Sequence, residues 1–228
     1  MDDKVFVRRK IAVFLISVII MALGVVLSTV AVLGTSPISS VPWVLSLGTG
    51  YSLGVATILF NIILILAGVL IMRRNFKLVY LGEVVILLIF SIMCDVFKGV
   101  FSFVVIDNYL WQWVMIIIAA IVLAFGVSLE VAANVTMMPG EFFISFVVFK
   151  THWDFGKLKV VFDVSMIIIA AALSMMFFGE LRGVREGTVF AALFVGIFVR
   201  RYTAFFKKHG FYQWIGHHDL TARTAKKS

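Results

Sequence analysis

The chain has 228 residues, of which 62% are hydrophobic and only 14% are charged, and its mean hydropathy is +1.11. A soluble protein of this size cannot enclose so much apolar surface, so the composition excludes a soluble globular fold and predicts an all-α polytopic membrane protein. The net charge of +8 comes from basic residues at the ends of apolar runs, with no aromatic-interleaved basic patch, so we expect the lipid bilayer and not nucleic acid as a partner.

Six apolar runs are long enough to cross a bilayer, because about 20 helical residues span ~30 Å of hydrocarbon. In chain order, these expected spans are residues 11–33, 52–72, 78–97, 110–133, 158–178 and 188–205. Two shorter apolar pieces, residues 37–47 and 139–149, would reach only about half that thickness as helices. The first run is too long for a cleaved signal peptide, so we interpret it as an uncleaved span.

A proline-marked segment occurs twice, 102 residues apart. In one ungapped register, the aligned pairs include Gly24 with Gly126, Pro37 with Pro139, and Asn61 with Asp163. Duplicated halves that each contain an interrupted segment are typical of secondary transporters. We therefore predict an inverted 3+3 internal repeat with two short re-entrant or broken helices. The predicted units are a cytoplasmic N-tail (1–10), a first membrane repeat (11–99), an extracytoplasmic loop (100–109), a second membrane repeat (110–206) and a basic cytoplasmic C-tail (207–228).

The distribution of basic residues orients the chain with both termini in the cytoplasm. Six spans place 17 lysines and arginines inside and three outside. If both short pieces crossed, the eight-span alternative would give a split of 15 to 5, and the two repeats would be parallel. Charge and the length of the short pieces both favour six spans.

Polar residues inside the apolar segments are the candidates for a substrate or ion site, because an ionised carboxylate near mid-bilayer costs ~2.5 kcal/mol or more. A helix that begins at a proline within the membrane also points its free N–H groups at the interior. The candidates are Gly34, Thr35, Ser36, Pro37, Asn61, Glu83, Glu130, Asn134, Pro139, Glu141, Asp163, Arg185, Glu186 and Thr188.

These candidates also have purely structural interpretations. The serine hydroxyls and Glu141 could cap the short helices, and Glu141 could instead meet a cation. Asp163 could pair with Lys159 one turn earlier, and Arg185 could pair with a neighbouring glutamate.

No catalytic triad, glycine-rich phosphate loop or zinc-protease motif occurs in the sequence, so we expect neither enzymatic activity nor a cofactor. The adjacent His217 and His218 lie on the C-terminal tail, where such pairs rarely make a closed metal site, so we expect no metal. The single cysteine, Cys94, cannot form an internal disulfide.

Three motifs resemble the YczE/YyaS/YitT family of bacterial integral membrane proteins: residues 34–42 (GTSPISSVP), residues 52–54 (SLG) with Thr57 and Asn61, and residues 185–189 (REGTV) with Gly196. The resemblance covers roughly residues 10–205 and is looser in the second half, where residues 136–139 read TMMP instead of GTSP. It implies a bacterial inner-membrane protein of five to six spans, and it supplies neither a substrate nor site residues.

We predict a small secondary transporter or permease of the bacterial cytoplasmic membrane, for an unknown small solute and coupled to a proton or cation. Two alternatives remain open: a substrate-binding membrane subunit of a larger transport complex, and a membrane accessory protein without a solute. Small residues such as Gly24 would also allow a homodimer or partner membrane subunits. In the aligned register, Ser28 and Asn61 of the first half correspond to Glu130 and Asp163 of the second. The second half is therefore the more acidic, and we expect residues that bind a coupling proton or cation to lie there.

Overall fold

The computed structural model describes residues 3–72 and 82–216, and this part of the chain is nearly all helical. Within it, extended backbone pairs only at an isolated bridge between Gly34 and Val184. The helices are α1 (Asp3–Val30), α2 (Pro37–Thr49), α3 (Leu53–Met72), α4 (Gly82–Val100), α5 (Tyr109–Ala133), α6 (Pro139–Thr151), α7 (Phe155–Phe178), α8 (Glu186–Lys208) and α9 (Phe211–Ile215).

Five helices are long and apolar enough to cross a membrane: α1, α3, α5, α7 and α8. They confirm the predicted class, a multi-pass helical membrane protein. The helix in the remaining expected span, α4, carries Glu83, Asp95 and Lys98 among its 19 residues and is not one of the five. The first residues of that expected span, 78–81, lie outside the described residues, so the count of six spans stays a prediction.

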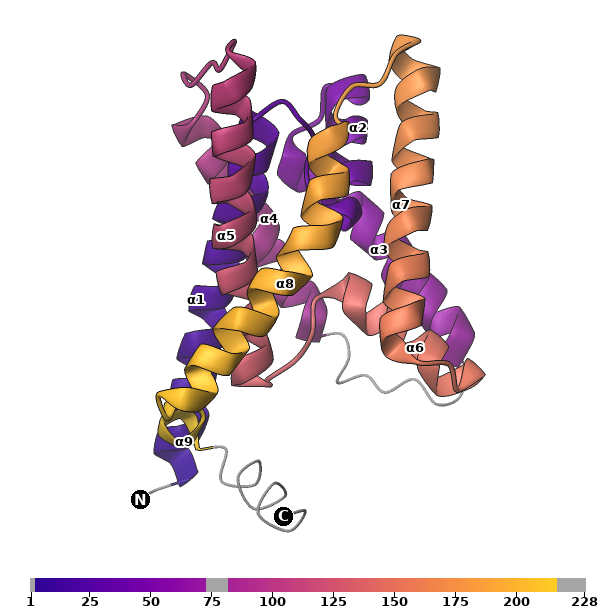
Figure 1. Cartoon of the computed structure of the whole chain (residues 1–228). Coiled ribbons are helices and arrows are strands. Elements are labelled where there is room, and N and C mark those ends of the chain that lie inside the picture. The colour runs from indigo at the N-terminus through magenta and orange to yellow at the C-terminus, as the bar shows by residue number, and fades with distance from the viewer. Residues whose placement is uncertain (1–2, 73–81, 217–228) are drawn as a thin grey trace.

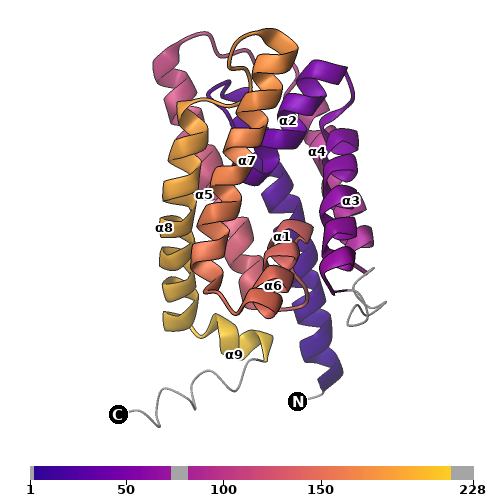
Figure 2. The same cartoon turned by 90° about the vertical axis from the view of Figure 1, so that its right-hand side faces the viewer.

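Both short helices begin at the prolines that the sequence indicated and contain 13 residues each. Proline suits the first helical position because its missing N–H has no partner there and its φ is already helical. Each short helix ends at a residue with left-handed backbone, Gly50 at φ 75° and His152 at φ 56°. At 1.5 Å per residue they reach about 20 Å, which is too short to cross. Figures 1 and 2 place α2 near one end of the bundle and α6 near the opposite end.

The most extensive helix packing in the described residues is the close crossing of α1 and α5. A Cβ added to Gly24 would lie 2.7 Å from the backbone nitrogen of Leu123, and one added to Gly126 would lie 2.9 Å from that of Met21. The two glycines are 102 positions apart, and so are Met21 and Leu123. Each helix therefore presents its glycine to the same place on the other helix.

The other helices pack in pairs that match at the same spacing of 102 residues. Helix α4 packs on α1 and α8 on α5, while α2 packs on α7 and α6 on α3. The match is incomplete. Helix α3 packs against α4, whereas the fully described α7 and α8 do not pack along one another and stand apart in Figure 1.

The described part of the C-terminal tail is folded. Helix α8 continues to Lys208, and α9 returns to the start of α1, where the Arg9 guanidinium lies 5.0 Å from the Trp214 ring and donates a hydrogen bond to the Trp214 carbonyl at 3.1 Å. Both ends of the described chain thus lie on the side of the bundle where α6 lies (Figure 2).

Candidate functional site

The two short helices meet where they begin. A Cβ added to Gly140, the second residue of α6, would collide with Cδ1 of Ile38, the second residue of α2. These two residues are also 102 positions apart. Pro37 and Pro139 beside them are buried. The helix starts therefore face each other in the protein interior, although the helices run to opposite ends of the bundle (Figure 1).

Hydroxyl groups line the segment that leads into α2, and two hydrogen bonds join them to one another. The hydroxyls of Ser28 and Thr35 are 2.5 Å apart, and Ser36 donates to Ser39 over 2.9 Å. These side chains are buried, so their mutual bonds satisfy groups that would otherwise be costly. Thr35 and Ser36 thus shape the start of α2, and Ser36 does not cap the helix with its side chain.

Gly34 is required by the backbone of this segment. Its φ is 105°, a conformation that L side chains rarely adopt, and a Cβ would collide with the buried hydroxyl of Thr188 on α8. We expect Gly34→Ala to destabilise the protein by about 1–3 kcal/mol. The measurement is the thermal unfolding midpoint of the detergent-purified variant, with Gly99→Ala as control because that position is open. Equal midpoints for the two variants would contradict the described contact.

The start of α6 is held by a carboxylate from α5. Oε1 of Glu130 accepts a hydrogen bond from the backbone N–H of Met138 at 2.9 Å, and Glu130 is only 3% exposed. Met138 is the residue before Pro139, so Glu130 takes the first N–H that the helix cannot use itself. The negative charge also suits the positive end of the helix dipole.

A second carboxylate, Glu83 of α4, lies beside the same linker. It is 3% exposed, and its Oε1 accepts a hydrogen bond from the Thr136 hydroxyl at 3.3 Å. Its Oε2 is buried and has no hydrogen-bond partner. The charges of Glu83 and Glu141 both act on Glu130. An unpaired buried acceptor is unfavourable, so the oxygen of Glu83 is open to a further ligand.

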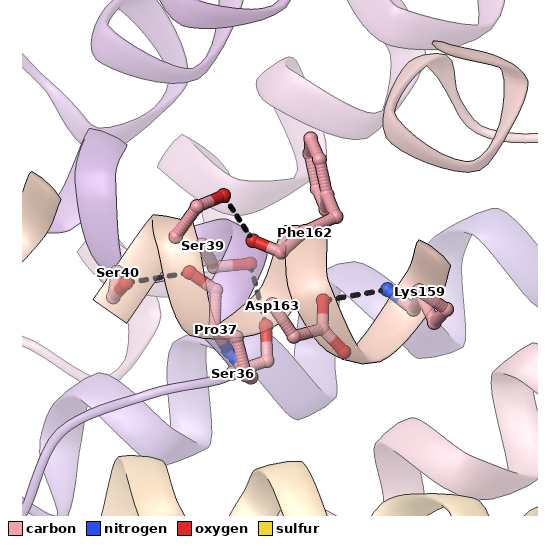
Figure 3. Close-up of polar contacts among 8 residues, drawn as sticks. Ser36, Pro37, Ser39, Ser40, Lys159, Phe162 and Asp163 are labelled. Atoms are coloured by element: carbon pink, nitrogen blue, oxygen red, sulfur yellow. Dashed lines mark hydrogen bonds and ion pairs between the residues drawn. The ribbon is translucent and has the colours of Figure 1, made fainter. Parts of the chain in front are cut away.

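Asp163 of α7 forms an ion pair with Lys159 at 2.9 Å, which is the structural interpretation anticipated from the sequence. The pair is nevertheless part of the same region. Figure 3 shows the Asp163 carboxylate between Lys159 and the start of α2 at Ser36. The charges of Lys159 and Asp163 also act on the half-buried Glu141 in the first turn of α6.

The other candidates are more peripheral. The Asn61 amide donates to the Thr57 carbonyl in its own helix, and the exposed Asn134 ends α5 with a φ of 49°. Arg185 pairs with Glu186 at 3.2 Å on the exposed surface where α8 begins, as its structural interpretation anticipated. The hydroxyl of Thr188, in contrast, is buried without a hydrogen-bond partner.

Sequence reasoning missed Asp95, which joins two helices. Its carboxylate accepts from the Ser52 hydroxyl at 2.7 Å and from the Gly54 N–H at 2.6 Å, and so caps α3 from α4. A charge inside an apolar run was the available signal, as at Glu83. In the described residues no three His, Cys, Asp or Glu side chains converge as metal ligands would. A cavity of about 380 Å³ lies elsewhere, around the loop before α5, and is lined by residues such as Ile106, Trp111 and Met115.

Five apolar helices, two half-length helices that meet inside the bundle, and buried carboxylates around their starts define a multi-pass helical membrane protein. The chain belongs to the family of unknown function DUF6198, whose model matches residues 8–204. No curated protein and no solved structure matches it.

Proposed function

We propose that this protein is a small secondary transporter of the bacterial cytoplasmic membrane, with six spans and both termini in the cytoplasm. The observation that carries the proposal is the meeting of the α2 and α6 starts at Ile38 and Gly140, with carboxylates from α4, α5, α6 and α7 around them. Facing helix starts at mid-membrane are the arrangement in which transporters bind solutes and coupling ions. The resemblance to the YczE/YyaS/YitT family agrees with the proposed membrane. The proposal assigns no enzymatic activity and no cofactor.

An inverted internal repeat is part of this proposal, and backbone features at the same spacing support it. The short helices begin and end 102 positions apart. The left-handed residues Val32 and Asn134 form another pair at this spacing, as do Gly50 and His152. A left-handed valine is rare, so its match with Asn134 is hard to attribute to chance. The placement of α2 and α6 at opposite ends agrees with halves that insert in opposite orientations.

The two halves differ in how their last two long helices pack, and this difference suggests how transport could alternate between two states. Helix α3 packs against α4, while α7 and α8 do not pack along one another. In an inverted repeat, exchanging the two local conformations converts a state open to one side into a state open to the other. We propose that transport alternates between the observed arrangement and one in which α7 meets α8 and α3 leaves α4.

The charges around the site favour coupling to a cation or proton. Charge interactions link four carboxyl groups in a low-dielectric region, those of Glu83, Glu130, Glu141 and Asp163. Lys159 is the one lysine whose charge acts on this group. If all were ionised, the group would carry three uncompensated negative charges, which the membrane interior strongly disfavours. A bound proton or cation would offset this repulsion, and its loss would favour a rearrangement.

Uptake into proteoliposomes tests the proposal. The purified chain should move at least one solute of a chemically broad panel under a sodium or proton gradient, and Glu83→Gln should lower the rate at least 10-fold. Glu180→Gln is the matched control, because Glu180 forms an exposed ion pair with Arg182. If no solute moves, and Glu83→Gln and Asp163→Asn have no effect in cells, the proposal is wrong. Transport by the lone chain would exclude the alternative of a binding subunit that needs a larger complex.

A further inference from the structure

We propose that Glu83, Thr136 and Glu130 form the binding site for a monovalent metal cation. Its role as the coupling ion rests on the proposed transport function, whereas binding itself does not. The ligands would be oxygens of two carboxylates, one hydroxyl and the backbone of the linker between α5 and α6.

The unpartnered oxygen of Glu83 is the first observation. Glu83 is 3% exposed, its Oε1 accepts a hydrogen bond from the Thr136 hydroxyl, and its Oε2 has no hydrogen-bond partner. Thr136 uses its proton in this bond, so the lone pairs of its oxygen remain available to a metal ion. A buried oxygen without a donor, beside a hydroxyl oxygen that is already oriented, is the pattern that a cation would complete.

Glu130 supplies the second carboxylate. Its Oε1 is committed to the Met138 N–H, which leaves Oε2 for another ligand. The carboxyl groups of Glu83 and Glu141 both lie near enough for their charges to act on Glu130. A cation between Glu83 and Glu130 would be attracted to both carboxylates and would offset their mutual repulsion. Both attractions would be strong because the protein interior has a low dielectric constant.

The linker before α6 differs from its counterpart before α2. Residues 31–36 are tied by backbone contacts to the start of α8 and to the segment before it: the Gly187 N–H donates to the Leu33 carbonyl at 2.9 Å, and Gly34 forms its bridge with Val184. Residues 134–138 instead meet α4 through the side chains of Thr136 and Glu83. Irregular backbone at membrane depth is tolerated where its carbonyls meet an ion or water, and unwound segments of this kind coordinate sodium in transporters.

A monovalent ion fits better than a divalent one. Calcium takes six to eight oxygen ligands, several of them carboxylates, and magnesium demands near-ideal octahedral geometry. Among the described residues no three acidic, histidine or cysteine side chains converge closely enough for such a site. Two carboxylates and neutral oxygens in a buried position suit a singly charged ion.

Thermal unfolding of the detergent-purified full chain tests the site without requiring a known solute. Midpoints are measured at constant ionic strength in sodium, potassium or choline chloride, at two pH values. We expect the better alkali cation to raise Tm by on the order of 5 °C over choline, because a ligand that binds only the folded state stabilises it. Glu83→Gln and Thr136→Val should each abolish this shift, and Glu180→Gln should keep it.

Two outcomes would overturn the inference. One is a wild-type Tm that responds to pH but to neither alkali cation, which would assign the carboxylates to proton binding. The other is a cation shift that survives in both Glu83→Gln and Thr136→Val. Failure of the transport proposal would be recognised separately: the cation would still stabilise the protein, but no solute would move in proteoliposomes. Transport driven by protons without a cation shift would retain the function and exclude the metal site.

Discussion

Alanine at Gly126 is expected to force α1 and α5 apart and to lower the stability of the whole bundle. The added Cβ would lie 2.7 Å from Cγ of Met21 and 2.9 Å from its backbone nitrogen. A side chain can rotate away, but the backbone of α1 can move only as a helix. Overpacking of this kind costs about 3 kcal/mol, which corresponds to a fall in Tm of roughly 10 °C for a chain of this length. Gly24→Ala should behave alike, because its Cβ would meet the backbone of Leu123 at 2.7 Å.

Gly196→Ala is the matched control for both substitutions. Gly196 is also a glycine within a membrane-spanning helix, α8, but a Cβ there would meet no atom within 4 Å. Alanine has the higher helix propensity, so this variant should be as stable as the wild type or slightly more stable. The measurement is Tm of the purified variants, together with the recovery of monodisperse protein in detergent. If Gly126→Ala and Gly196→Ala unfold at the same temperature, the helices do not cross as described.

Sequence reasoning was most successful where local chemistry decides the backbone. Pro37 and Pro139 each fix a helical φ and lack an N–H, so a helix that begins there needs no tertiary partner to define its start. The starts of both short helices were predicted to the residue. The first span was less accurate: α1 begins at Asp3, well before residue 11, and ends at Val30 before residue 33. The helix continues through the charged residues 8–10. The change in hydropathy at residue 11 predicts where the chain enters the membrane, but it does not predict where the helix begins.

The partners of the buried polar groups could not be predicted, because they depend on helices brought together from distant parts of the sequence. The Glu130–Met138 bond requires the linker to fold back over α5, and the bond from Gly54 to Asp95 joins α3 to α4. The one partner that was anticipated within the site, Lys159 for Asp163, is four residues away in the same helix. The charged residues of α4 are tolerated because neighbouring segments contact them, as α3 contacts Asp95 and the linker before α6 contacts Glu83.

Exchanging Ile38 and Gly140 is expected to preserve the fold, although each single change damages it. Gly140→Ile would place a branched side chain against Ile38 and near Cε1 of Phe162, where a Cβ already lies 3.9 Å away. Ile38→Gly would remove the side chain that fills this contact. Each single variant should lose about 2–4 kcal/mol, by overpacking in the first case and by a cavity in the second.

The double variant again has one isoleucine and one glycine at this contact, but the glycine is now on α2 and the isoleucine on α6. Because positions 38 and 140 are 102 apart and contact each other, the symmetry axis of an inverted repeat would pass between them, and the exchange would conserve the packed volume. We expect a coupling free energy of about 2 kcal/mol between the two changes, measured from the Tm or denaturant unfolding of the four proteins in the cycle. Ile38→Gly combined with Gly196→Ile makes the same chemical changes at positions without contact and should be additive.

Additivity in the Ile38→Gly/Gly140→Ile variant would mean that the two short helices do not meet at these residues, and the candidate site would lose the geometry on which it depends. Recovery of stability together with recovery of solute uptake would give the stronger result. The double variant would then retain a functional contact between α2 and α6 although the contact residues of the two halves are exchanged. That result requires the two halves to be equivalent at this contact. A transporter that alternates by exchanging the conformations of its halves needs this equivalence at the contact between α2 and α6 more than at any other.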